Sequence, residues 1–180
     1  MREAFKVGLN NFGENRVLDA IEKINLLEEE ITSKSHYHLI GHLQSNKVKK
    51  AVGVFDLIHS VDSLKLAVEI DGIAKQKNIV QNILVQVNNA GEEQKSGIAP
   101  SQLEELIEKI KMLQNVELKG LMTIAPLTDD EAYLRKLFCE MRELKEKFHL
   151  KELSMGMSND YKIALEEGAT MIRLGRTLFE

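Results

Sequence analysis

Short apolar runs alternate along the chain with longer segments in which apolar residues recur every three or four positions. A short apolar run predicts a β-strand, and the longer period predicts a helix with one buried face. The run Ile83-Leu-Val85 suits a strand that is buried on both faces, as in a parallel sheet. The expected strands are residues 10–14, 36–41, 56–61, 82–88, 118–125, 152–157 and 170–175. The expected helices are residues 17–31, 46–54, 63–77, 101–113, 128–148 and 159–167, preceded by a helix end at residues 1–7.

Polar residues mark the starts of three of these helices. Ser63 or Asp62 is placed to cap the helix at residues 63–77. Ser101-Gln-Leu-Glu104 and Thr128-Asp-Asp-Glu131 have the spacing of capping boxes, in which the first side chain accepts a bond from a free helix N–H. We therefore expect Ser101 and Thr128 to cap the helices that follow them.

Repeated strand–helix pairs with short connections predict an α/β protein with a parallel sheet covered by helices. A doubly wound open sheet and a (β/α)8 TIM-type barrel both have this pattern. The dinucleotide-binding fingerprint Gly-x-Gly-x-x-Gly and the Walker A sequence are both absent, and the regular repetition favours the barrel. A barrel needs eight strands, so the expectation is a single domain over residues 1–180 that lacks the first strand and the last helix.

The composition is that of a globular protein with a substantial core. Of the 180 residues, 43% are hydrophobic, which excludes a disordered chain or a disulfide scaffold. Cys139 is the single cysteine, so no internal disulfide forms, and a reducing, cytoplasmic compartment is expected. The net charge of −4 argues against a nucleic-acid partner. The most apolar run, Ile79–Val87, is interrupted by polar residues, so no membrane association is expected.

Two glycine-containing segments follow the last two expected strands, where barrels of this type commonly hold a phosphate. Ser158 and Asn159 follow one strand at an expected helix start, and Gly175 follows the other. Free N–H groups, hydroxyl groups and cationic side chains together suit an anion. The other residues of the expected site are Met157, Arg173, Arg176 and Thr177. Ordinary helix capping by Ser158 and Asn159 is the alternative.

A cluster of histidines raises a second possibility. His36, His38, His42 and His59 could bind a metal, but no acidic residue lies within the stretch that carries the first three. The simpler interpretation makes His38 a strand residue and His42 a hydrogen-bond donor in a loop. We therefore expect no metal site. Cys139 lies within a periodic helix and is expected to be a small core residue rather than a nucleophile.

Several specific motifs make the chain resemble the pyridoxal phosphate homeostasis proteins, which are single-domain relatives of the fold-type III, alanine-racemase-like barrel. The motifs occur in family order and span nearly the whole chain. They are Phe12-Gly-Glu-Asn15, His38-Leu-Ile-Gly-His-Leu-Gln-Ser-Asn-Lys47, Ile58-His-Ser-Val-Asp-Ser63, Gln86-Val-Asn88, Lys95-Ser-Gly97, Gly120-Leu-Met122, Leu153-Ser-Met-Gly-Met-Ser-Asn-Asp-Tyr161 and Arg173-Leu-Gly175.

The resemblance implies a cytoplasmic protein that binds pyridoxal 5′-phosphate (PLP) and acts in vitamin B6 and amino-acid homeostasis without enzymatic turnover. It implies phosphate contacts from Ser158, Gly175 and Thr177, and a place for Arg173 opposite the pyridine nitrogen. The ring side of the pocket would be lined by Asn15, His42, Gln44 and Asn46.

One departure from the family concerns the covalent link to the cofactor. The Ala-Val-Ser-Lys type of segment that carries the Schiff-base lysine is absent, and neither Lys47 nor Lys95 occupies an equivalent position. Non-covalent PLP is therefore expected. Two alternatives remain: an amino-acid racemase-like enzyme of fold type III, and a barrel remnant that binds only phosphate.

A missing strand has structural consequences as well. The strands at residues 10–14 and 170–175 would each present an unpaired edge, which favours either oligomerisation or low stability, whereas the closed form would be a monomer. The gap would also expose inward-facing residues, for which Leu39 and Ile172 are the expected examples.

Overall fold

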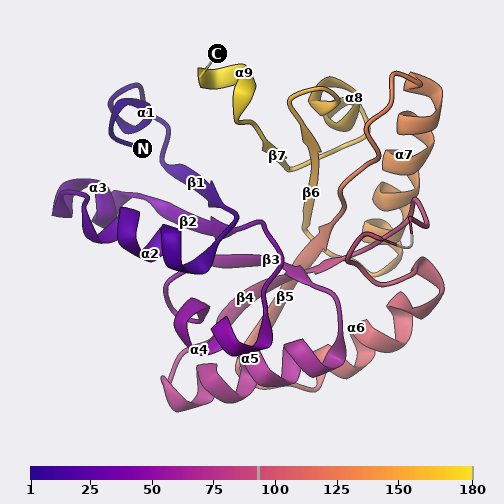
Figure 1. Cartoon of the computed structure of the whole chain (residues 1–180). Helices are drawn as coiled ribbons and strands as arrows, with labels where there is room; N and C mark the ends of the chain where they lie inside the picture. The colour runs from indigo at the N-terminus through magenta and orange to yellow at the C-terminus, as the bar shows by residue number, and fades with distance from the viewer. Residues whose placement is uncertain (93, 180) are drawn as a thin grey trace.

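The computed structural model describes residues 1–92 and 94–179, except for the side chains of Arg176 and Phe179. Strands and helices alternate along the whole chain (Figure 1). The strands are β1 (Asn11–Glu14), β2 (His36–Leu39), β3 (Leu57–Val61), β4 (Gln81–Gln86), β5 (Val116–Met122), β6 (Glu152–Met157) and β7 (Met171–Arg173). The α-helices are α1 (Arg2–Lys6), α2 (Val17–Asn25), α3 (Glu29–Lys34), α4 (Val48–Ala51), α5 (Leu64–Gln76), α6 (Leu103–Lys111), α7 (Glu131–Lys147), α8 (Tyr161–Glu166) and α9 (Arg176–Phe179). Two 3₁₀ turns, η1 (Ser45–Lys47) and η2 (Pro100–Gln102), precede α4 and α6.

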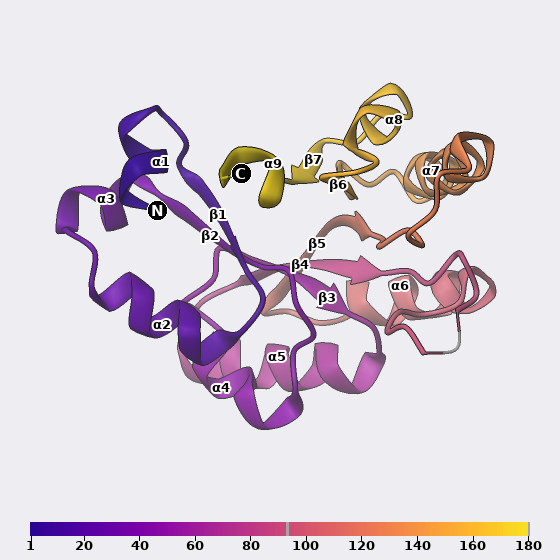
Figure 2. The same cartoon turned by 45° about the horizontal axis from the view of Figure 1, so that its top comes forward.

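The seven described strands form one parallel sheet in the order β1-β2-β3-β4-β5-β6-β7. The sheet curls so that β1 and β7 face each other across an opening, with the two chain ends on either side of it (Figures 1 and 2). Neighbouring strands pair, but within the described part of the chain β1 and β7 do not pair with each other. The predicted barrel with seven strands is therefore confirmed, and it is nearly closed.

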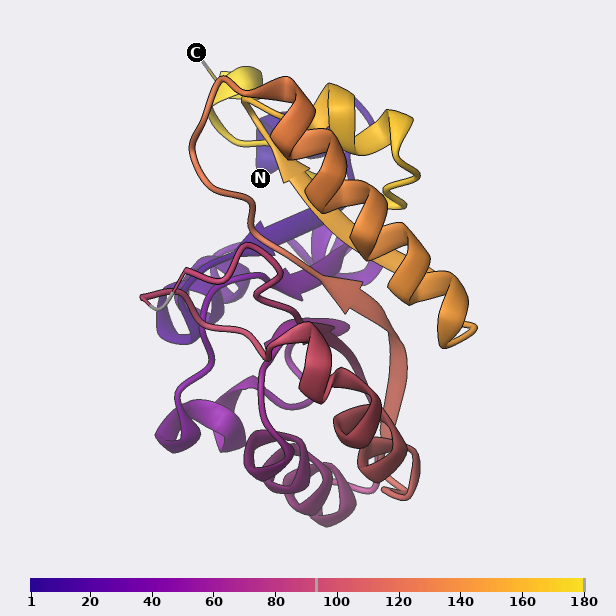
Figure 3. The ribbon, with the colours of Figure 1, turned by 90° about the vertical axis from the view of Figure 1, so that its right-hand side faces the viewer.

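The helices lie on the outer side of the sheet. Figure 3 shows α7 running along the outside of β5 and β6, and Figure 2 shows α5 and α6 below the central strands. The main core lies between the strands and this helical layer, where Ile58, Ile83 and Leu121 are fully buried. Among the described residues, every helix is too short or too polar to cross a bilayer.

The inner face of the sheet has an apolar layer of its own. Leu57, Leu84 and Met122 are buried there on the three central strands, with Met171 of β7 packed against them. Such layers of inward-facing side chains fill the interior of α/β barrels.

Leu39 and Ile172 were expected to face the interior, but both side chains point towards the helical layer. Leu39 is fully buried in the core beneath the helices, because its neighbours face the interior: His38 on β2 and Ile40 directly after it. Ile172 lies beside Gly156 and Ala164, towards α8. Alternation along a strand is strict, so choosing the wrong parity places every side chain on the wrong face.

The helix expected at residues 17–31 is two helices, α2 and α3. The backbone turns at Leu26, whose N–H bonds the Lys23 carbonyl in a tight last turn. Arg2 crosses from α1, donates to the Leu26 carbonyl and bonds the Glu28 carboxylate at 2.9 Å. A side chain distant in sequence thus satisfies the backbone at the break, which the local periodicity did not reveal.

Only one of the expected caps forms as predicted. The Ser63 hydroxyl accepts the Leu66 N–H at 3.3 Å. At α7 the cap is Asp130, which accepts the Tyr133 N–H, while Thr128 accepts the N–H of Asp130 itself. The Ser101 prediction was wrong, because the chain enters α6 through the 3₁₀ turn η2 and no side chain caps α6.

Candidate functional site

A cavity of about 1030 Å³ occupies the opening between β1 and β7 and extends into the interior of the sheet. Its wall is formed by the inner faces of β1, β2, β3 and β7 and by the loops that follow β5 and β6. Ligands of parallel α/β proteins bind at the carboxyl ends of the strands, where these loops lie. This cavity is therefore the candidate functional site.

Arg173 brings a positive charge into the cavity. Its Nη1 donates to the Ser154 hydroxyl at 2.6 Å, and its Nη2 donates to the Thr123 carbonyl at 2.8 Å. Burial lowers the pKa of Arg173 to about 10, and the nearby Asp160 carboxylate opposes this shift. The guanidinium therefore stays charged at neutral pH while Ser154 of β6 and Thr123, which directly follows β5, hold it in place.

Two histidines extend this polar group across the interior. His59 Nδ1 lies 3.0 Å from the Ser154 hydroxyl, and His59 Nε2 lies 3.0 Å from His38 Nδ1. His38 Nε2 in turn lies 3.1 Å from Asn11 Oδ1. Burial, followed by the charges of His38 and Arg173, lowers the pKa of His59 to about 3, so this ring is neutral at physiological pH. The two rings therefore bond each other directly.

The end of β6 and the loop after it form one rim of the cavity, with Met157 on the strand and Ser158 and Asn159 in the loop. Helix α8 begins after Asp160, later than expected, and Asp160 Oδ1 accepts the Met157 N–H at 2.6 Å. The main-chain N–H groups of Ser158 and Asn159 make no backbone bond within the described residues. They are therefore available to an anion at the rim.

Gly156 allows β6 and α8 to pack closely. It lies inside the protein with a φ of +89°, and a Cβ there would come within 2.6 Å of Ala164 Cβ. The glycine is required because β6 packs directly against α8. Gly175, in contrast, is exposed at the cavity edge with no described atom within 4 Å of an added Cβ.

The remaining predicted site residues divide into two groups. Asn15 lines the cavity at the end of β1. His42, Gln44, Asn46 and Thr177 are exposed and lie outside the cavity wall. His42 Nδ1 lies 3.9 Å from an Asp62 carboxylate oxygen. The side chain of Arg176 lies outside the described part of the structure.

Sequence reasoning missed the interior group formed by Ser154, His59, His38 and Asn11. The signal was available, because these polar residues occupy inward-facing positions in strands of the predicted sheet. Buried polar side chains need partners, so such residues on neighbouring strands are expected to bond one another.

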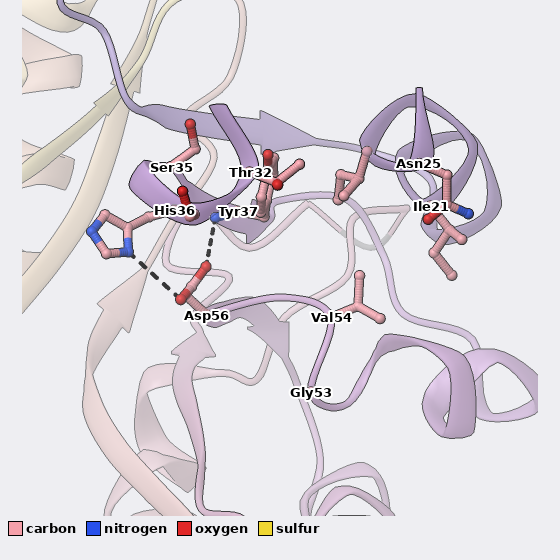
Figure 4. A pocket seen from close by; sticks show the side chains of 11 residues that line it. Ile21, Asn25, Thr32, Ser35, His36, Tyr37, Gly53, Val54 and Asp56 are labelled. Atoms are coloured by element: carbon pink, nitrogen blue, oxygen red, sulfur yellow. Dashed lines mark hydrogen bonds and ion pairs between the residues drawn. The ribbon is translucent and has the colours of Figure 1, made fainter. Parts of the chain in front are cut away.

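A second, smaller hollow of about 490 Å³ lies on the outer side of the sheet, between β2, the helices α2 and α3 and the segment before β3 (Figure 4). Asp56 accepts the Tyr37 N–H at 2.7 Å and lies 3.6 Å from His36 Nδ1 (Figure 4). These bonds join β2 to the start of β3, and the hollow lies away from the strand ends where ligands bind. We assign it a structural role.

The fold and cavity define a class of protein, the alanine-racemase-like parallel barrel. The family model for the alanine racemase N-terminal domain matches residues 1–180. Alanine racemase of Clostridium difficile 630 has the same fold, with a TM-score of 0.76 and 18% identity over 99% of this chain and 47% of that one.

Closer relatives narrow the class. The pyridoxal phosphate homeostasis protein of Aquifex aeolicus is 43% identical over 99% of this chain and 80% of its own length, and that of Synechocystis is 40% identical over 98% and 83%. PipY of Synechococcus elongatus, solved with PLP bound, superposes with a TM-score of 0.88 at 42% identity over 99% of this chain and 85% of that one. This chain belongs to the pyridoxal phosphate homeostasis protein family.

Proposed function

We propose that this chain binds PLP in the large cavity and acts in PLP and amino-acid homeostasis without enzymatic turnover. The observation that carries the proposal is the Arg173 guanidinium, held by Ser154 and Thr123 in a cavity of about 1030 Å³. The relative that is solved with PLP bound supports it.

The cavity residues fit the pyridine ring of PLP. Arg173 has five N–H groups, of which two bond the protein within the described residues, so three are available to a ligand. An arginine that donates to the pyridine nitrogen keeps that nitrogen unprotonated. PLP supplies a reactive aldehyde and an electron-accepting ring, and an unprotonated nitrogen weakens the ring as an electron sink. This argues for holding the cofactor rather than for catalysis on it.

The phosphate group fits the rim of the cavity. Ser158 supplies a hydroxyl, the N–H groups of Ser158 and Asn159 are available, and Gly175 leaves the opposite backbone accessible. We propose that Thr177 approaches from the segment after β7. His42, Gln44 and Asn46 could reach the ring only if the loop after β2 moves inward.

Non-covalent binding follows from the residues that line the cavity. Among the described residues, no lysine is part of its wall. The Nζ of Lys95 donates to the carbonyl of Ala125, which lines the cavity, at 3.3 Å, but Lys95 itself is not part of the wall. An imine requires an amine within bonding distance of the aldehyde carbon. The chain should therefore release PLP on dialysis.

Absence of turnover is proposed from the state of the ionisable groups in the cavity. An enzyme of this type needs a general acid or base that can exchange protons with its substrate. His38 and His59 are instead bonded to each other, and His59 keeps a pKa of about 3. The proposed compartment is the cytoplasm, with PLP as the small-molecule partner.

The test loads the purified chain with PLP and measures retention by absorbance after gel filtration, before and after dialysis. Arg173→Leu should lower retention at least tenfold, because a charged hydrogen bond to the ring is lost. Lys95→Ala is the matched control for loss of a cation and should retain PLP. Equal losses in the two variants would contradict the role of Arg173.

Reduction with borohydride followed by mass measurement tests the covalent alternative. The expected mass is that of the unmodified chain. A single stoichiometric adduct would show that a lysine of this chain has taken over the covalent role. Failure to retain PLP while still binding inorganic phosphate would support the phosphate-only alternative.

A further inference from the structure

Five side chains join the two sides of the cavity in one hydrogen-bond network. It runs from Arg173 on β7 through Ser154 and His59 to His38 and ends at Asn11 on β1. Each link is between 2.6 and 3.1 Å long. The network crosses the interior and contacts both strands that border the opening.

The hydrogen bonds between Ser154 and Asn11 in this network all point the same way, with each donor on the side of Ser154 and each acceptor on the side of Asn11. The Asn11 amide nitrogen donates to Asn10 Oδ1 at 2.9 Å, so the atom that faces His38 is an acceptor. His38 Nε2 must therefore carry the proton, and in a neutral ring its Nδ1 then accepts from His59 Nε2. His59 Nδ1 is left as an acceptor, and only the Ser154 O–H can donate to it.

The direction has a consequence for Ser154. Because its proton is committed to His59, its lone pairs face Arg173 and always offer an acceptor to Nη1. The opposite direction would place an unprotonated His38 Nε2 against Asn11 Oδ1, where two acceptors meet. Burial lowers the pKa of both histidines, which keeps the rings in the neutral state that this pattern requires.

We propose that Ser154 and His59 are positioning residues. The directional hydrogen-bond network fixes both imidazoles as Nε2–H tautomers and holds the Arg173 guanidinium toward the ring nitrogen of the cofactor. The role towards the cofactor rests on the proposed PLP function, whereas the tautomers are a property of the free protein. Ser154 thereby makes the pocket selective for a ligand whose ring carries an unprotonated nitrogen.

The first test needs no cofactor. Long-range ¹H–¹⁵N spectra of the free protein at pH 7.5 report the tautomer of each of the five histidines. His38 and His59 should both show a protonated Nε2, and Asn11→Ala should remove the preference at both rings, because Asn11 Oδ1 sets the direction of the hydrogen bonds. Ser60→Ala is the control, because Ser60 is fully buried on β3 beside His59 but makes no side-chain bond within the described residues. A protonated Nδ1 at His59 in the unmodified chain would overturn the proposal.

The second test compares PLP with an analogue in which carbon replaces the pyridine nitrogen. The unmodified chain and Ser60→Ala should bind PLP roughly tenfold more tightly than the analogue, the size expected for one hydrogen bond to a charged group. Ser154→Ala should lose this discrimination while its affinity for inorganic phosphate is unchanged.

The two proposals fail in different ways. If the unmodified protein binds neither PLP nor the analogue, the PLP function is wrong. The tautomers of His38 and His59 still test the direction of the hydrogen-bond network. If it prefers PLP and Ser154→Ala keeps the same preference, the PLP function stands and the positioning role of Ser154 is wrong.

Discussion

The central strands and the two outer strands of the sheet differ in what surrounds them. All five residues of β3 are buried, whereas β1 buries only Phe12 and β7 has three residues of intermediate exposure. Central strands have neighbours on both sides, a helical layer outside and an apolar layer inside. The outer strands lack one neighbour, and the cavity lies where that neighbour is missing. Stability is therefore concentrated in the centre and binding capacity at the opening.

Truncating one apolar side chain in each region is the prediction with the largest expected difference in stability between the central and outer strands. Leu84→Ala removes a fully buried side chain from the inner apolar layer and should lower the free energy of unfolding by about 3 to 4 kcal/mol. Ile172→Ala at the outer strand should cost about 1 kcal/mol, because Ile172 is partly exposed. Urea denaturation measures both, and equal losses would show that the outer strand is as well packed as the centre.

Glycine replacements test the same contrast through close backbone contacts. A Cβ at Gly120 of β5 would collide with the Glu152 carbonyl of β6 and come within 2.8 Å of Glu152 Cα, so Gly120→Ala should cost about 3 kcal/mol. Gly175→Ala meets no described atom and should change stability by less than about 0.5 kcal/mol. Thermal unfolding compares the two variants. A large loss from Gly175→Ala would show that the end of β7 is packed more tightly than its exposure indicates.

Acidification should lower the stability of the protein through His59, which belongs to the hydrogen-bond network that links the central and outer strands. The pKa of His59 is about 3 in the folded protein, against an ordinary value of 6.5. Between these values the unfolded chain takes up a proton that the folded protein refuses, so stability is complete above pH 6.5 and falls as the pH decreases. The loss should reach about 2 kcal/mol at pH 5.

Urea midpoints at pH 7.5 and pH 5 measure this effect. His59→Gln should reduce the difference between the two pH values, whereas His149→Gln, which alters an exposed histidine, should leave it unchanged. An unchanged difference in His59→Gln would mean that other groups carry the acid sensitivity.

Periodicity and motifs along the chain were sufficient for the order of the strands and for the family. Each predicted strand forms. For the central strands the reason is that an apolar run buried on both faces has few alternatives to a parallel sheet. Met157, Ser158, Arg173, Gly175 and Asn15 all border the cavity, since residues at the carboxyl ends of parallel strands share one edge. Their roles in binding remain predictions.

Contacts between distant segments decided the rest. The break between α2 and α3 is stabilised by Arg2, and the inward or outward direction of Leu39 and Ile172 depends on how each strand is set into the sheet. The bonded group of Arg173, Ser154, His59 and His38 brings together four strands whose residues are up to 135 positions apart (from 38 to 173). Local sequence patterns specify which elements form and which faces are apolar. Only packing of the whole chain selects the partner of each buried polar group, because hydrogen bonds require distances of about 3 Å that no local pattern encodes.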